Sequence, residues 1–109
     1  MAVQRYTLDV AGFDWDDGNR FKCQKHGVSE IAIESVFRRS ITVMPDPAHS
    51  KTEERFKAIG MSDDGRWIFL VFTLRARHGR RFVRPISARF MHKKEVEHYE
   101  KETATPQKR

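Results

Sequence analysis

Two arginines that follow or end apolar runs are the residues of this chain best suited to bind a phosphate group. The runs 67–74 and 82–89 are predicted strands, with Arg75 just after the first and Arg89 ending the second. Alternate residues of a strand share a face, so Thr73 lies beside Arg75 and Ser87 beside Arg89. A guanidinium group donates two parallel hydrogen bonds to phosphate. If the two faces coincide, these side chains form one basic patch, and the face of Arg89 also holds Val83 and Pro85. The alternative is that both arginines point to water at strand ends.

An acidic pair comes just before another predicted strand, residues 55–61. Glu54 follows Glu53 and precedes Arg55, after a loop that carries His49. A carboxylate beside an arginine cluster can act as a general base or can hold the arginines in place. The alternative is an ordinary exposed charge triplet.

A short predicted helix, residues 19–26, carries further titratable side chains. Lys22 and His26 are four residues apart and project from one face, with Lys25 close by. They could supply a phosphate contact and a group that titrates near neutral pH. Alternatively, His26 caps the C-terminal end of the helix, where a cation is favourable.

The charge of the chain is unevenly distributed. The formal net charge is +6, yet residues 1–65 hold nine basic and eleven acidic residues, and residues 95–109 hold three basic and four acidic ones. Residues 66–94 contain nine basic residues and no acidic one. A field concentrated in this way favours an anionic partner such as a nucleic acid. A solvated basic face that keeps the protein soluble is the alternative.

Few residues suit a metal or a cofactor. The single cysteine, Cys23, excludes an internal disulfide and forms a C-x-x-H pair with His26. A structural zinc site needs four ligands, commonly in two such pairs, and no second pair is present. The glycines are isolated, so no phosphate-cradling loop is indicated. We therefore predict neither a metal nor a cofactor.

The spacing of apolar residues predicts one α+β domain with helices packed on an antiparallel sheet. Two N-terminal helices, a sheet of three to four strands and a C-terminal helix are expected over residues 1–101, followed by a flexible basic tail at 102–109. No apolar stretch of membrane-spanning length and no signal-peptide core occurs, so a cytoplasmic protein without a membrane is expected. The expected elements are a strand at 6–13, helices at 19–26 and 29–38, strands at 41–43, 55–61, 67–74 and 82–89, and a helix at 93–101.

Local signals accompany these elements. The turn at 14–18 carries helix-start acids, Gly27 suits the left-handed end of the first helix, and Ser29 is the expected N-cap of the second. Ile33, Val36 and Phe37 form an apolar stripe on the second helix. Pro85 indicates that the last strand bulges there or lies partly at an edge.

An ordered series of short motifs across residues 11–100 resembles the BrnT-type toxin family. Asn19 stands near a position where that family usually has a lysine, and Pro85 replaces an aliphatic residue. The series consists of Phe13-Asp14-Trp15-Asp16, Lys25-His26-Gly27-Val28-Ser29, Val36-Phe37, Pro45-Asp46, His49-Ser50, Glu53-Glu54-Arg55, Ile59-Gly60, Ser62, Gly65-Arg66, Thr73, Arg75, Ile86-Ser87-Ala88-Arg89, Glu95 and Tyr99.

The resemblance implies a RelE-like α+β fold and a ribonuclease that arrests translation. It also implies a BrnA-type antitoxin partner, expected to form a heterotetramer, and binding of operator DNA mainly through that antitoxin. A chain that keeps only a nucleic-acid-binding or antitoxin-docking surface, without catalysis, is the alternative.

We expect RNA cleavage without metal, through attack of a ribose 2′-OH on the adjacent phosphate. Such a reaction needs a base, an acid and positive charge at the transition state. The expected catalytic residues are Glu54, Arg55, Arg75, Arg89 and His26, with Glu54 or His26 as the base. The expected RNA-binding residues are Lys22, Lys25, Arg66, Thr73, Arg84 and Ser87.

Overall fold

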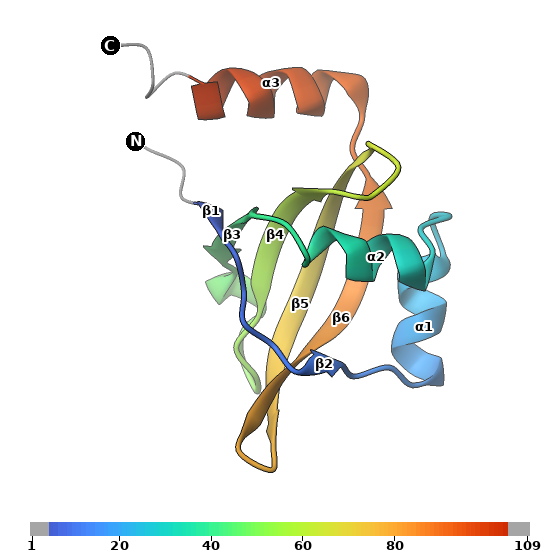
Figure 1. The fold of residues 1–109 in the computed structure, drawn as a ribbon, viewed down its shortest axis with the longest axis vertical. Helices are drawn as coiled ribbons and strands as arrows, with labels where there is room; N and C mark the ends of the chain where they lie inside the picture. The colour runs from blue at the N-terminus through green and yellow to red at the C-terminus, as the bar shows by residue number, and fades with distance from the viewer. Residues whose placement is uncertain (1–4, 105–109) are drawn as a thin grey trace.

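The computed structural model describes residues 5–104, which form a mixed β-sheet and three α-helices (Figure 1). The predicted α+β class is confirmed, and the RelE-like architecture stays a prediction. In chain order the elements are β1 (Arg5–Tyr6), β2 (Gly12–Phe13), α1 (Asp17–Gln24), α2 (Glu30–Val36), β3 (Ile41–Pro45), the 3-10 helix η1 (Pro47–His49), β4 (Phe56–Met61), β5 (Trp67–Arg77), β6 (Arg80–Phe90) and α3 (Lys93–Ala104).

The sheet contains six strands within the described chain, in the order β1-β3-β4-β5-β6-β2. The prediction of three to four strands is therefore wrong, although β3 to β6 do form an antiparallel series. The expected strand at 6–13 divides into two short pieces. Tyr6 pairs with Ile41 at one edge, whereas Phe13 pairs with Val83 in parallel at the other. The intervening segment crosses the sheet, and a residue pattern cannot show that two ends of one stretch reach opposite edges.

Strand β6 contains a β-bulge next to its proline. Val71 of β5 pairs with Ser87, but the next residue, Phe72, pairs with Pro85, so Ile86 is the extra residue. The predicted irregularity around Pro85 is thus confirmed. Because one additional residue reverses the alternation of side chains, Pro85 faces the buried side of the sheet and Ser87 faces the opposite side.

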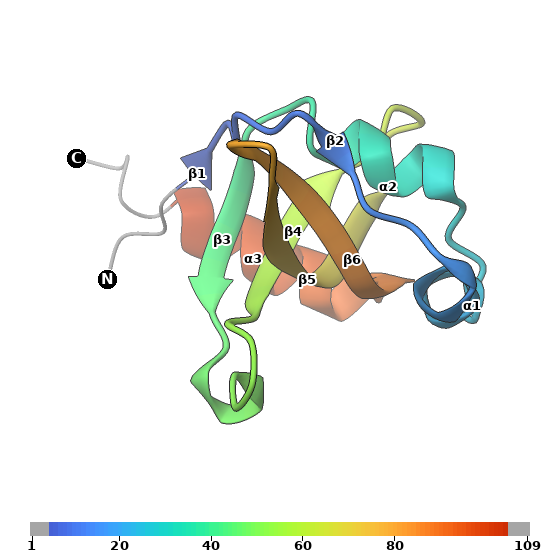
Figure 2. The ribbon, with the colours of Figure 1, turned by 90° about the horizontal axis from the view of Figure 1, so that it is seen from below.

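The helices and loops cover the two faces of the sheet differently. Helix α2 and the segment between β1 and β2 lie on one face, and α1 lies beside β6, as Figures 1 and 2 show from two directions. The loop that carries η1 lies towards the other face, at a distance from α2 (Figure 2). That second face is the one on which Arg75 lies, and it is only partly covered.

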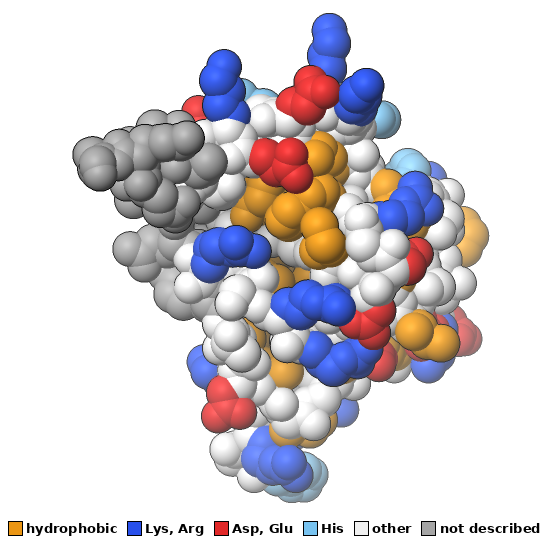
Figure 3. All heavy atoms as spheres, turned by 45° about the horizontal axis from the view of Figure 1, so that its top comes forward, with side chains coloured by type: hydrophobic (Ala, Val, Ile, Leu, Met, Phe, Trp, Pro, Cys, Tyr) orange, Lys and Arg blue, Asp and Glu red, His pale blue; other side chains and the backbone are white. Residues whose placement is uncertain are grey.

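Helix α3 packs against the far end of this second face. Tyr99 is buried, shares a hydrogen bond with Thr42 and meets Trp67 edge to face with ring centroids 5.1 Å apart. Figure 3 shows hydrophobic side chains gathered near this end of the molecule, bordered by charged ones. A largely apolar cavity of about 310 Å³ adjoins the helix and is lined by Thr42, Met44, Ile59, Phe69, Arg89, Met91, Glu95, His98, Tyr99 and Glu102.

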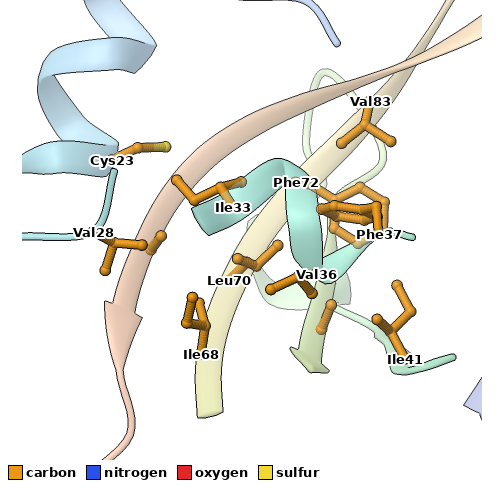
Figure 4. Packing of buried hydrophobic residues seen from close by; sticks show 12 residues of the cluster. Cys23, Val28, Ile33, Val36, Phe37, Ile41, Ile68, Leu70, Phe72 and Val83 are labelled. Atoms are coloured by element: carbon orange, nitrogen blue, oxygen red, sulfur yellow. The ribbon is translucent and has the colours of Figure 1, made fainter. Parts of the chain in front are cut away.

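The hydrophobic core fills the space between α2 and the strands (Figure 4). Phe37, directly after α2, meets Phe72 edge to face at 5.3 Å between ring centroids, while Ile33 and Val36 are fully buried. The predicted apolar stripe of Ile33, Val36 and Phe37 is therefore confirmed. Burying side chains of this size contributes about 1.5–3 kcal/mol each to folding, before entropy is counted.

Two local signals at the helix ends are confirmed, although α1 and α2 are displaced by up to two residues from the predicted ranges 19–26 and 29–38. The hydroxyl oxygen of Ser29 accepts a hydrogen bond from the Ala32 N–H at 3.1 Å, which confirms the predicted N-cap. Gly27 has a φ of +85°, the left-handed conformation expected after α1. Helix α3 continues to Ala104, so the first three residues of the predicted tail are helical. The remainder of that tail, 105–109, lies outside the described residues. Over residues 5–104, no helix combines the length and apolar character needed to cross a bilayer.

Asn19 fixes α1 to the sheet through a fully used side-chain amide. Its oxygen accepts the Asp16 N–H at 2.7 Å, which completes a reciprocal capping box at the start of the helix. Its nitrogen donates to the carbonyl oxygens of Asp14 at 2.9 Å and Pro85 at 2.8 Å. One buried side chain therefore joins the helix start to β6.

Replacing Asn19 with alanine is expected to destabilise the protein, because two buried carbonyl groups lose their donor. Leaving a buried polar group unsatisfied costs about 1–3 kcal/mol. Chemical denaturation should show a lower free energy of unfolding for Asn19→Ala. The exposed Gln24→Ala, on the same helix, should stay within about 0.5 kcal/mol of the parent chain. Equal losses for both variants would contradict this role of Asn19.

The close approach of β4 to α2 leaves no room for a side chain at Gly60. A methyl group there would lie 2.5 Å from Val36 Cγ1 and 2.8 Å from Ile41 Cγ2. Gly60→Ala is expected to lower the free energy of unfolding by about 1–3 kcal/mol through overpacking. Gly12→Ala is the matched control, because its methyl group would meet only ordinary contacts at 3.4 Å or more from Phe82. Thermal unfolding of both variants tests this, and an unchanged midpoint for Gly60→Ala would refute it.

Candidate functional site

A polar cavity of about 310 Å³ lies between α1, the loop before β4, and strands β5 and β6. It brings together four of the residues predicted to bind RNA or catalyse its cleavage, contributed by four separate segments. The loop 53–55 and α1 form its walls, and the uncovered face of the sheet forms its floor. Its lining consists of Gly18, Asn19, Lys22, Glu53, Arg55, Arg75, Arg84 and Ile86.

Lys22 and Arg55 are the cations of this cavity whose side chains stay without a partner. Among residues 5–104, neither side chain makes a hydrogen bond or an ion pair. Lys22 comes from α1 and Arg55 from the residue before β4, so the two approach the cavity from different walls. Their charge is therefore available to an anion that enters.

Arg75 is held by a carboxylate of the loop. Its Nε donates to Glu53 Oε2 at 2.6 Å and a terminal nitrogen donates to Glu53 Oε1 at 3.2 Å, which is a two-pronged contact. These bonds lower the pKa of Glu53 below its ordinary value and raise that of Arg75. Glu53 is consequently a weak proton acceptor, and its role in the site is to orient the guanidinium group.

A buried carboxylate, Asp14, joins the arginines of both strands. Its oxygens lie 2.9 Å from a nitrogen of Arg77, 3.6 Å from one of Arg75 and 3.8 Å from one of Arg84. Arg84 also forms an ion pair with Asp16, the N-cap residue of α1, at 2.9 Å. The pKa of Asp16 is lowered, first by the backbone N–H of Asn19 and then by Arg84. The acids before α1 therefore position two arginines of the cavity.

Thr73 acts on the loop and does not face a phosphate position. Its hydroxyl is buried and donates to the Glu54 carbonyl oxygen at 2.8 Å. This bond fixes the backbone of residues 53–55 against β5. The Glu54 side chain is exposed and does not line the cavity, whereas Glu53 does. Of the acidic pair, the structure places Glu53 and not Glu54 beside the arginines.

The predicted convergence of Arg75 and Arg89 is wrong. Both lie on the same face, but Arg89 pairs with Phe69 and Arg75 pairs with Phe82, six residues further along β5. At about 3.3 Å per residue, their backbones are roughly 20 Å apart. The expected shared face of Val83, Pro85, Ser87 and Arg89 is also wrong, because the bulge turns Val83 and Pro85 into the core.

Arg89 instead belongs to the α3 end of the sheet. It donates to both oxygens of Glu95, at 2.8 and 2.9 Å, and lies over the ring of Phe69, 4.9 Å from its centroid. The pair lowers the pKa of Glu95 to about 2 and raises that of Arg89. Ser87 points to the same face as Arg89 and does not line the Arg75 cavity.

Three further predicted residues lie away from the cavity. Lys25 and His26 are exposed in the turn after α1, so the expected helical face shared by Lys22 and His26 ends before His26. Arg66 is exposed and its guanidinium group lies 3.5 Å from the ring centroid of Phe90. None of the three lines the cavity.

Cys23 is part of the core rather than of a site. It is fully buried, and burial raises the pKa of its thiol to about 11. A metal ligand or nucleophile needs the thiolate, which this environment disfavours. Within residues 5–104, no group of three or more His, Cys, Asp or Glu side chains is placed to hold a metal ion.

Four polar residues of the site were missed as functional candidates in the sequence. Asp14 and Asp16 read as helix-start acids, Arg77 lies beyond the expected end of its strand, and Asn19 was noted only as a departure from a family pattern. A signal for them was present, because the acidic residues before α1 contrast with the segment 66–94, which contains no acidic residue. Buried charges require partners of opposite charge, so these acids could have been paired with arginines of that segment.

The Arg89–Glu95 pair makes part of the stability depend on pH. The pKa of Glu95 is about 2 in the folded chain, against about 4.3 for an unfolded glutamate. Because the folded pKa is the lower one, the contribution is complete above the unfolded value and disappears as pH falls towards 2.

The urea midpoint of the parent chain is thus expected to decline more steeply between about pH 5 and 2 than that of Glu95→Gln. Glu97→Gln, at an exposed position of the same helix, is the control and should follow the parent. Parallel pH curves for the parent chain and Glu95→Gln would rule out this linkage.

Comparison with known proteins agrees with the resemblance seen in the motifs. A search of curated proteins found no match. The sequence model of a family described as the ribonuclease toxin, BrnT, of type II toxin-antitoxin systems matches residues 15–95. This span includes α1, the loop 53–55 and every cavity-lining residue. The chain therefore belongs to the BrnT family of ribonuclease toxins.

Proposed function

We propose that the cavity between α1 and the sheet binds an RNA phosphodiester and that the protein cleaves it without a metal ion. The observation that carries this proposal is the convergence of Lys22, Arg55, Arg75 and Arg84 on one cavity. Positive groups from four segments suit a phosphate whose charge grows during reaction, since donors fixed beforehand need no reorganisation.

The net charge around the cavity is positive, which favours the binding of an anion. Five cations, Lys22, Arg55, Arg75, Arg77 and Arg84, face three carboxylates, Asp14, Asp16 and Glu53. The difference leaves two positive charges, which correspond to the unpaired Lys22 and Arg55. These two contact the phosphate directly, while the acids hold Arg75 and Arg84 in orientation.

The reaction proposed is attack of a ribose 2′-oxygen on the neighbouring phosphorus with departure of the 5′-oxygen. The non-bridging oxygens gain charge in the transition state, and the unpaired guanidinium group of Arg55 donates to them in the proposed reaction. Arg75, held by Glu53, adds positive charge beside them. A planar guanidinium group suits this task because it donates two parallel hydrogen bonds. Lys22 contributes a point charge from the opposite wall.

The wider activity proposed is that of a toxin that arrests translation and is neutralised by a BrnA-type antitoxin. We propose a heterotetramer of the two proteins that binds operator DNA mainly through the antitoxin. The family membership supports a partner and an RNA target at a coarser level. We propose the cytoplasm as the compartment in which the toxin meets RNA.

One observation favours a second candidate, a docking module that no longer cleaves RNA. Arg75 already makes two hydrogen bonds to Glu53, so a phosphate would have to share or displace that carboxylate. Such a module would retain RNA without producing fragments, and the assay below separates the two candidates.

Arg55→Ala is expected to reduce RNA cleavage about a hundredfold, since each oriented donor to a transition-state oxygen contributes about that factor. Lys22→Ala should lower the rate in the same direction. The measurement is fragment formation from a defined RNA in the presence of a chelator. Arg80→Ala is the matched control, because it removes one exposed positive charge away from the cavity.

Intact RNA with the parent chain would overturn the enzyme proposal. Equal rates for Arg55→Ala and Arg80→Ala would leave an enzyme but remove this cavity as its site. Arg89→Ala should retain most of the activity, because its backbone is roughly 20 Å of strand away from Arg75.

A further inference from the structure

The cavity holds no group suited to accept a proton at neutral pH. Its ionisable side chains are Lys22, Glu53 and three arginines. Guanidinium groups do not lose a proton in proteins, and Glu53 has a lowered pKa because of Arg75. Attack by a ribose 2′-oxygen needs an acceptor for its proton, and histidine is the side chain whose ordinary pKa suits this task.

His49 is the histidine whose ring is fixed by a buried carboxylate. Its Nδ1 lies 3.2 Å from Asp46 Oδ1 and 3.1 Å from Asp46 Oδ2. The Asp46 side chain is 5% exposed, whereas that of His49 is 68% exposed. The carboxylate therefore holds one ring nitrogen of an imidazole that is otherwise largely exposed.

The other histidines lack this arrangement in the described part of the chain. His98 lies 3.8 Å from Glu102 on the exposed side of α3, with both side chains more than half exposed. His26, His78 and His92 have no carboxylate within 4.0 Å of the ring. Among residues 5–104, Asp46 is also the single carboxylate within that distance of His49.

The loop that carries His49 also carries the cavity residues Glu53 and Arg55. Backbone bonds close it, since the Asp46 N–H donates to the Arg55 carbonyl at 3.0 Å. The Ser50 hydroxyl donates to the Asp46 carbonyl at 2.7 Å and accepts the Arg55 N–H at 2.9 Å. His49 and Arg55 thus belong to one small closed loop on the uncovered side of the sheet (Figure 2).

We infer that His49 is the general base of the ribonuclease reaction and that Asp46 is its positioning residue. This inference rests on the proposed function. His49 Nε2 takes the proton of the 2′-OH as the 2′-oxygen bonds to phosphorus. The bond from phosphorus to the 5′-oxygen breaks, that oxygen takes a proton from water, and the hydroxide left behind is neutralised by the proton of the His49 imidazolium. The products are a 2′,3′-cyclic phosphate and a free 5′-OH.

Asp46 has two physical effects on this step. By accepting a hydrogen bond from Nδ1–H, it keeps the proton on that nitrogen and leaves Nε2 free to act as base. Its negative charge also stabilises the imidazolium that forms. Other charged groups on the same loop are Lys51, Glu53, Glu54 and Arg55, and they form no ion pair with the ring.

The test is the pH dependence of cleavage of a defined RNA with chelator present. His49→Gln is expected to reduce kcat at least a hundredfold, the usual contribution of general base catalysis, and to remove the acidic limb of the pH profile. Asp46→Asn should lower kcat while keeping an acidic limb, because the imidazole is still present. His98→Gln is the matched control and should behave as the parent chain.

Binding of an uncleavable RNA with 2′-deoxyribose at the scissile position should be unchanged by His49→Gln. Imidazole added to His49→Gly should restore part of the activity, which a structural role would not allow. If the parent chain cuts RNA and His49→Gln cuts it at the same rate, this inference alone is overturned. A parent chain that leaves RNA intact would overturn both this inference and the proposed function.

Discussion

The structure depends on one buried carboxylate, that of Asp14. An isolated buried charge is strongly unfavourable, and it is tolerated when charged partners and hydrogen bonds surround it. Arg75, Arg77 and Arg84 supply those partners within 4.0 Å, and the Asp14 N–H donates to the Val83 carbonyl at 2.8 Å. The N-terminal segment is thereby tied to β5 and β6. This contact therefore also positions helix α1, which begins three residues later.

The bulge at Ile86 sets the second constraint. Without it, the side chains of β6 would keep one alternation along the whole strand, and Arg89 would share a face with the buried Val83. With it, the strand buries Val83 and Pro85 near one end and Ala88 near the other. Ser87 and Arg89 therefore come to the uncovered face, where Arg89 binds Glu95 and anchors α3. The inserted residue thus brings Arg89 of the helix contact to the same face of the sheet as Arg84 of the cavity.

Local features were predictable from the sequence, and pairings between distant segments were not. Ser29 and Gly27 act through their own backbone and nearest neighbours, so the residue type suffices to place them. The register of β5 against β6 depends on the bulge, and Pro85 indicates an irregularity without showing which residue is the extra one. The choice of Glu53 over Glu54 depends on the loop fixed by Thr73, a contact across nineteen positions. The site was therefore half predicted: its arginines of β5 and β6 and the acidic pair at 53–54 were found, while Asp14 and Asp16, which also hold those arginines, were missed as site residues.

The acid-free segment 66–94 shows why a charge count overstates a binding surface. Arg75, Arg77 and Arg84 neutralise acids of the N-terminal segment and loop, and Arg89 neutralises Glu95. Much of the positive charge of this segment therefore neutralises acidic residues elsewhere in the chain. The unpaired cations of the cavity, Lys22 and Arg55, come from outside this segment. Since a paired arginine presents little net charge to a ligand, the attraction for a phosphate arises from Lys22 and Arg55, and the basic segment supplies the rigid frame around them.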